Sequence, residues 1–169
     1  MALEADMPRF SISAAIAAAL VLFLSAGTAE AQIKAYGVNT ADRLQLPPVI
    51  AARPFAGTFE AYAQGDRSDI RMVLTISENA GLVAGQVNSF YTDPRIGMEG
   101  WHQASGYPQG IGGRVSNGVF SSPFGDSRSR FDAVYWCDAT TICASTYSAN
   151  LMRYYLLRFT PVAGRQAQR

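Results

Sequence analysis

The chain has 169 residues, and its 14 basic and 13 acidic side chains nearly balance. The basic residues are scattered along the chain, whereas a protein that binds nucleic acid carries a basic stripe or patch. The sequence therefore predicts no nucleic-acid partner.

Residues 7–31, MPRFSISAAIAAALVLFLSAGTAEA, have the layout of a secretory signal peptide. Arg9 supplies a positive charge, residues 14–24 are unbroken apolar, and residues 29–31 form a small-x-small cleavage site. The apolar run is shorter than the ~20 residues that span a bilayer. We therefore expect an exported protein, periplasmic or secreted, with no membrane span in its mature chain.

The rest of the chain has the size of one domain. The segment after the signal contains Pro47, Pro48 and Pro54 and shows no sustained periodicity, which predicts an extended arm. The expected organisation is a signal peptide at 1–31 with translation starting at Met7, an arm at 32–56, a β-domain at 57–162 and a disordered tail at 163–169.

Strand-like runs separated by turn sequences follow one another at a spacing of about a dozen residues, which is typical of all-β proteins. In the run 70–76, alternate apolar residues share one face, and Asn117-Gly118 is a favoured hairpin turn. The segment 92–113 is rich in glycine and predicts a long loop with room for one short strand around Trp101. The runs lie at 57–63, 70–76, 82–91, 113–122, 131–137, 143–149 and 152–160.

Consecutive, hairpin-linked strands would leave two bare edges in an open sheet, and closure removes them. We therefore expect a small antiparallel up-and-down β-barrel of about eight strands. A sandwich built from the same strands is the alternative.

The only two cysteines, Cys137 and Cys143, lie between two strand-like runs. An exported protein meets an oxidising environment, so a disulfide across the base of a hairpin is expected. No Cys-x-x-Cys spacing is present, and the single histidine, His102, lies far away in the sequence. We expect no metal site and no cofactor.

The strand series resembles the calycin-type barrels, the lipocalin and avidin group. Gly57-Thr58-Phe59 is similar to the Gly-x-Trp that opens these proteins, with Phe59 in place of Trp, and residues 79–87, NAGLVAGQV, are similar to an avidin-like hairpin step. Arg158 matches a last-strand arginine that covers the first-strand aromatic ring in lipocalins. The resemblance implies a secreted barrel that binds a ligand in its mouth. The outline is also similar to bacterial metalloprotease inhibitors, in which an N-terminal trunk enters the protease cleft.

Aromatic residues on both faces of the last strands are candidates for pocket walls, but core packing is the favoured interpretation. His102, oriented by Glu99 or Asp93, is the one candidate general base, but no nucleophile motif accompanies it. We therefore expect no catalytic residues. The predicted ligand-binding residues are Phe59, Trp101, His102, Tyr135, Trp136, Tyr147 and Tyr155.

The sequence as a whole predicts a binding protein for a small apolar or amphipathic ligand. The alternative is a protein-binding module, such as an inhibitor of an exported hydrolase, that uses the arm and the 92–113 loop. An enzyme dependent on His102 is the third possibility. The sequence does not indicate an oligomeric state.

Overall fold

A computed structural model describes residues 34–50, 53–64, 68–104, 108–124, 128–149 and 151–162. The expected signal peptide at 1–31 and the expected tail at 163–169 lie outside these ranges. The described residues form ten strands and two 3-10 turns. These are β1 (Lys34–Tyr36), η1 (Ala41–Arg43), β2 (Ala56–Gln64), β3 (Asp69–Asn79), β4 (Leu82–Asp93), η2 (Pro94–Ile96), β5 (Met98–Gln103), β6 (Gln109–Arg114), β7 (Val119–Pro123), β8 (Arg130–Trp136), β9 (Ile142–Ser148) and β10 (Arg153–Pro161).

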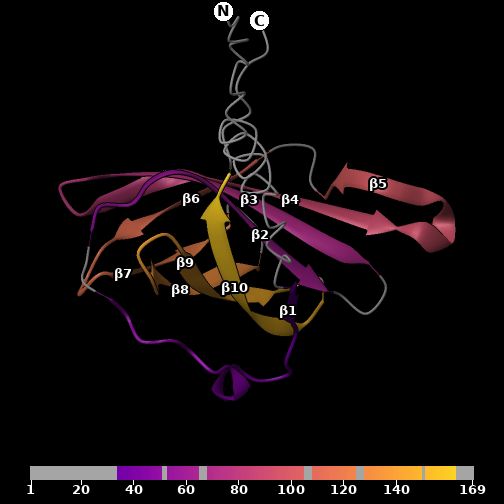
Figure 1. The fold of residues 1–169 in the computed structure, drawn as a ribbon, viewed down its shortest axis with the longest axis horizontal. Coiled ribbons are helices and arrows are strands. Elements are labelled where there is room, and N and C mark those ends of the chain that lie inside the picture. The colour runs from indigo at the N-terminus through magenta and orange to yellow at the C-terminus, as the bar shows by residue number, and fades with distance from the viewer. Residues whose placement is uncertain are drawn as a thin grey trace, which may run out of the picture. The chain divides into compact units, whose positions relative to one another are not determined.

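The strands confirm the all-β prediction and form one sheet that curls into a half-barrel. Eight of them follow the order β5-β4-β3-β2-β10-β9-β8-β7, and β6 also pairs with β4. Apart from the short β1, which runs parallel to β2, the pairs are antiparallel. Figure 1 shows β3 and β4 crossing the upper part of the view, β8 and β9 in the lower part, and β10 rising from the lower part to the upper.

The β6–β7 hairpin brings the two ends of this strand order together. Ser116 and Val119 exchange backbone hydrogen bonds of 2.8 and 3.0 Å, and Asn117 and Gly118 have φ angles of 52° and 77°. Two consecutive positive φ values are typical of the type I′ turn, so the hairpin predicted at Asn117-Gly118 is confirmed.

The glycine-rich segment 92–113 is more regular than predicted. It contains β5, as expected around Trp101, and also most of β6, which we did not expect. A Cβ atom at Gly113 would lie 2.6 Å from the Ser121 carbonyl oxygen, and one at Gly112 would lie 3.1 Å from the Val83 carbonyl oxygen. Glycine is therefore needed here because neighbouring backbones approach closely, which is a tertiary requirement rather than a turn signal.

Alternation along the strands directs the apolar residues into one core. In β3 the predicted inward residues Met72, Leu74 and Ile76 are buried, and Leu74 pairs with the buried Val87 of β4. Rings from distant strands also meet inside, because Phe131 of β8 contacts both Phe124, at 4.5 Å between ring centres, and Phe159, at 6.1 Å.

The arm lies against the barrel at both of its ends. Near its start, β1 pairs with the end of β2, and Val38 exchanges two 2.8 Å backbone hydrogen bonds with Tyr154 of β10. Near its end, the Ile50 N–H donates to the Trp136 carbonyl at 3.0 Å, and Phe55 is fully buried. Between these points the arm loops below β8 and β10 in the view of Figure 1 (indigo to purple).

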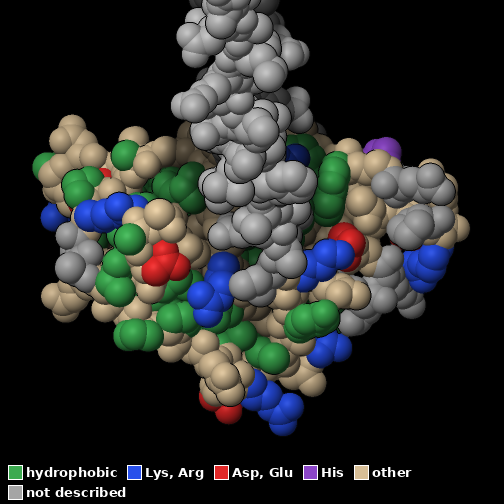
Figure 2. Space-filling model, in the orientation of Figure 1, with side chains coloured by type: hydrophobic (Ala, Val, Ile, Leu, Met, Phe, Trp, Pro, Cys, Tyr) green, Lys and Arg blue, Asp and Glu red, His purple; other side chains and the backbone are tan. Residues whose placement is uncertain are grey.

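On the face shown in Figure 2, basic side chains are separated by hydrophobic and uncharged ones. No helix within the described ranges has the length and apolar character needed to cross a membrane. Within the same ranges, no three His, Cys, Asp or Glu side chains form a group able to hold a metal ion.

Candidate functional site: a cavity at the barrel mouth

A cavity of about 460 Å³ opens at one end of the half-barrel, where β3, β6 and β8 begin and β4, β7 and β9 end. Its volume lies within the ~300–1,000 Å³ of typical small-molecule sites. We call it the mouth cavity. Its lining residues are Ser68, Ile70, Met72, Ser89, Phe90, Tyr91, Ala104, Gln109, Phe124, Ser129, Ser148 and Leu151.

Strand register places part of this lining. Met72 pairs with Ser89, and Ile70 pairs with Tyr91, one and two steps beyond the buried pair Leu74–Val87. Because strand side chains alternate with a period of two, these four residues continue the inward face toward the opening. Along this face the fully buried core residues are therefore followed by a half-buried cavity wall that includes the Ser89 hydroxyl.

The apolar side of the cavity is joined directly to the core. Phe124 is buried and packs edge-to-face on Phe131 with ring centres 4.5 Å apart. A 3.0 Å hydrogen bond from the Phe124 N–H to the Ser129 carbonyl fixes the residue after β7 relative to the start of β8. A ligand seated here would therefore contact rings that the fold itself holds in place.

The polar side of the cavity consists of uncharged groups. Four serines and Gln109 come from separate parts of the chain, and none of the described lining residues is acidic, basic or a histidine. The Ser129 hydroxyl also accepts a 3.0 Å hydrogen bond from the Ala149 N–H, which ties the start of β8 to the end of β9. Hydroxyl and amide groups of this kind orient a ligand through hydrogen bonds rather than through charge.

A second hollow, of about 500 Å³, lies at the other end of the half-barrel, and we call it the Arg53 hollow. The Arg53 guanidinium carbon lies 3.6 Å from the ring centre of Trp136, whose indole N–H donates to the Arg53 carbonyl at 3.1 Å. Phe55 also stacks on Trp136, with ring centres 5.9 Å apart and planes 13° apart. The hollow is lined by Arg53, Pro54, Ala56, Gly57, Thr58, Phe59, Trp136 and Pro161.

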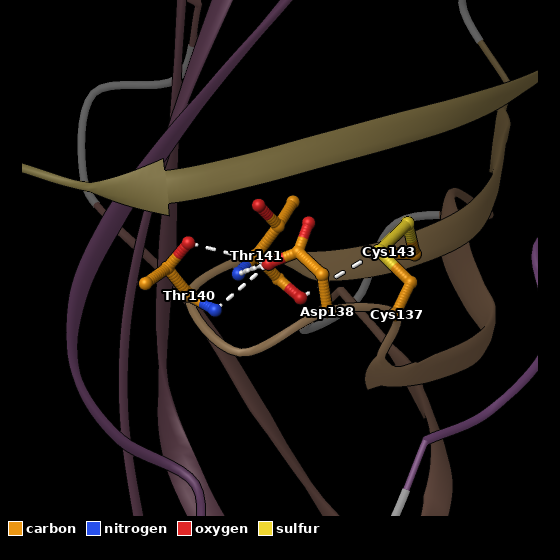
Figure 3. Close-up of a disulfide and its surroundings, with 5 residues drawn as sticks. All are labelled: Cys137, Asp138, Thr140, Thr141 and Cys143. Atoms are coloured by element: carbon orange, nitrogen blue, oxygen red, sulfur yellow. Dashed lines mark hydrogen bonds between the residues drawn. A yellow bond between two sulfur atoms is a disulfide. The ribbon is translucent and has the colours of Figure 1, made fainter.

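The predicted disulfide is confirmed and lies beside this second end. Cys137 and Cys143 are bonded across the β8–β9 hairpin, with Cα atoms 5.6 Å apart (Figure 3). Within the hairpin loop, the Asp138 carboxylate accepts backbone N–H bonds of 2.8 Å from Thr140 and 2.7 Å from Thr141. Partial burial raises the pKa of the Asp138 carboxyl, but the hydrogen bonds from Thr140 and Thr141 outweigh it and hold that pKa below its ordinary value.

Tyr135 lies on the outer side of β8, between the core residues Val134 and Trp136. Its side chain is only 2% exposed, and its hydroxyl has no hydrogen-bond partner in the described part of the chain. Burial raises the pKa of the Tyr135 hydroxyl, and the positive charge of Arg158 acts in the opposite direction. Tyr135 is therefore a packed residue next to the disulfide rather than part of either hollow.

The structure does not bring the seven predicted ligand residues together in one site. Phe59 and Trp136 meet edge-to-face at 5.7 Å and line the Arg53 hollow, and Tyr155 is buried in the core. None of the seven is among the residues that line the mouth cavity. The cavity residues carry no sequence signal of their own, since they are mostly serines and apolar residues at strand ends far apart in the chain.

The remaining predicted residues lie near the sheet surface. Trp101 is 41% exposed and contacts Tyr62 with ring centres 6.0 Å apart. Tyr147 packs against Tyr154 at 4.9 Å. These rings pack in pairs on neighbouring or nearby strands, as cross-strand aromatic residues commonly do.

His102 was the one candidate general base. Its ring lies 6.2 Å from that of Tyr91, and Asp93, one of its two predicted orienting acids, forms an ion pair with Arg95 at 3.4 Å. Asp93 is thus engaged with an arginine.

The chain matches no protein-family model, no curated protein and no solved structure. The calycin resemblance therefore stays a prediction that rests on the residues quoted for it and on the half-barrel. Arg158 is exposed on the outer side of β10, whereas Phe59 is buried inside and contacts Trp136. An arginine does cover an aromatic ring at this end, but it is Arg53 of the arm over Trp136.

Proposed function

We propose that this domain is a binding protein that takes up a small, uncharged amphipathic molecule in the mouth cavity. The observation that carries the proposal is the cavity itself, about 460 Å³ with aromatic and aliphatic walls and a set of serine hydroxyls. Apolar walls supply affinity in such sites, and a few placed polar groups supply orientation. A molecule with an apolar body and a hydroxyl or carbonyl group matches this lining.

The test is a titration with N-phenyl-1-naphthylamine, an uncharged ring compound whose fluorescence rises in apolar surroundings. Ser89→Trp places a large ring in the cavity, while Gln86→Trp places the same ring on the exposed face of the same strand. We expect the Ser89 variant to lose binding at least tenfold and the Gln86 variant to bind as the wild type does.

Thermal unfolding of both variants shows whether the added ring disturbs the fold. Equal probe affinity in wild type and in a folded Ser89→Trp variant would contradict a ligand in the mouth cavity. If the Ser89 variant loses binding as expected, displacement of the probe by long-chain alcohols and by monoacylglycerols would rank these two candidate ligand classes.

We further propose that the protein acts in the periplasm or outside the cell. The Cys137–Cys143 disulfide supports this location, because such bonds persist in oxidising compartments. The signal-like sequence at residues 7–31 supports it as well. N-terminal sequencing of the exported protein checks the predicted cleavage before Gln32.

A second candidate function, inhibition of an exported peptidase, is supported by the loop of the arm. This loop is extended, is held at Val38 and Ile50, and exposes Leu46 to 52% and Val49 to 45%. Because the loop is held at both ends, its two exposed apolar side chains are better suited to enter a protease cleft than those of an unattached N-terminal segment would be. The Leu46→Asp, Val49→Asp double variant should lose any inhibition of serine or metallo-endopeptidases, and unchanged inhibition would remove this candidate.

A further inference from the structure

We infer that the Arg53 hollow is a second binding site, for a small organic acid with an apolar body. The inference is independent of the mouth cavity, because the two sets of lining residues share no member. It rests on the position of the Arg53 guanidinium, on the absence of an acidic partner for it among the residues that the structure describes, and on the composition of the surrounding walls.

The guanidinium is held in place before any ligand arrives. It stacks on the Trp136 indole at 3.6 Å, and the indole N–H holds the Arg53 backbone carbonyl at 3.1 Å. Stacking occupies one face of the guanidinium and leaves its edge N–H groups available. A flat, fixed fork of N–H donors matches the two oxygens of a carboxylate.

Among the described residues, no acid pairs with the charge of Arg53. None of the four ion pairs among the described residues involves it, and its side chain is exposed. The acid bonded to this part of the arm, Glu78, accepts a 3.0 Å hydrogen bond from the Phe55 N–H instead. An anion entering the hollow would therefore meet a cation that no acid of the described ranges neutralises.

The rest of the hollow is mainly apolar. Pro54, Ala56, Phe59 and Pro161 line the hollow together with Arg53, and Gly57 contributes no side chain. Gly57 has a φ of 129°, and a Cβ atom there would lie 3.3 Å from the Phe59 ring. One cation among apolar walls suits an aromatic or short-chain carboxylate better than it suits inorganic phosphate, which has no apolar body.

The two tryptophans of the chain give a direct readout. The Trp136 indole lies in the hollow, and Trp101 lies on the exposed face of the sheet next to Tyr62. We would titrate ¹⁵N-labelled protein with phenylacetate and follow both indole N–H signals, assigned with Trp101→Phe. The Trp136 signal should shift to saturation, and the Trp101 signal should stay in place.

The ligand and protein controls isolate the charge. Phenylacetamide, which has the same ring and no charge, should bind at least tenfold more weakly. Arg53→Met keeps a long apolar side chain over the indole and should lose at least tenfold in phenylacetate affinity, because the carboxylate loses its charge-assisted hydrogen bonds. Arg43→Met, which removes another exposed arginine of the arm, should change nothing.

Equal affinity for the acid and the amide, or no Trp136 shift with either, would overturn the inference. Unchanged phenylacetate binding in Arg53→Met would do so as well. If Arg53→Met does not fold, Arg53→Lys and the acid–amide comparison decide, since lysine keeps the charge and loses the flat fork. Ser89→Trp should leave this titration unchanged, so loss of the mouth ligand and loss of the acid site are separate results.

Discussion

The two ends of the half-barrel each carry a hollow, but different side chains lie behind them. At one end, Arg53 and Phe55 lie against Trp136, and the disulfide holds the adjoining hairpin. At the other end, strand ends and serine side chains surround a cavity of about 460 Å³. The comparison teaches that the stabilising contacts are concentrated behind the Arg53 hollow, at what we call the packed end, so the lining of the mouth can change without unfolding the domain.

The largest expected effect comes from Phe55→Ala, which removes a fully buried ring from the packed end. The ring contacts Phe120 at 5.1 Å and Trp136 at 5.9 Å, so the free energy of unfolding should fall by about 3–5 kcal/mol in urea titrations. The exposed Leu46→Ala in the same arm should change it by less than about 0.5 kcal/mol. Probe affinity at the mouth, measured without urea, should stay at the wild-type value, and a matching loss there would break the separation of the two ends.

A smaller effect is expected when Cys137 and Cys143 are both replaced by alanine. The disulfide closes a short loop, so its removal should lower the free energy of unfolding by about 2 kcal/mol on the chain-entropy estimate. Hydrogen exchange should quicken at Ile142, next to the hairpin, and stay unchanged at Tyr91, which lines the mouth. Equal acceleration at both positions would mean that the two ends open together.

The smallest effect is expected from Asp138→Asn, which keeps the loop hydrogen bonds and removes the charge. Because the pKa of Asp138 is lowered in the folded state, its carboxylate stabilises the fold above its ordinary pKa of 3.8, and that stabilisation is lost as the pH falls through the folded-state value. The melting temperature of wild type minus that of the variant should therefore shrink between pH 5 and the acid limit. A difference that does not change with pH would show that the charge of Asp138 makes no contribution.

Most strands could be predicted because their signals are local. Alternation in 70–76 and the turn at Asn117-Gly118 need only neighbouring residues, and both were confirmed. β6 was missed because the need for its glycines comes partly from a backbone far away in the sequence: a Cβ atom at Gly112 would lie 3.1 Å from the Val83 carbonyl oxygen. No local pattern reports a contact of that kind.

The hollows could not be predicted for a related reason. Ser89, Ser129 and Ser148 meet at the mouth only after β4, β8 and β9 are in register, and an isolated serine carries no signal for such a meeting. Sequence reasoning searched for aromatic walls and selected rings that pack the core or the outer faces. The sequence predicted that Arg158 covers a ring at one end of the barrel. The arginine that does so is Arg53, which belongs to the arm, whose sequence shows no periodicity.

The pairing of β2 with β10 has a consequence for the order in which the domain is completed. The hairpin cysteines are 6 residues apart and can be joined soon after residue 143 reaches an oxidising compartment. In contrast, Glu60 must wait for Thr160, its partner in the sheet, until almost the last residue of the domain. Contacts between such distant residues fold slowly. During export, the emerging chain would therefore carry a joined hairpin while the edge of β2 that faces β10 is still unpaired.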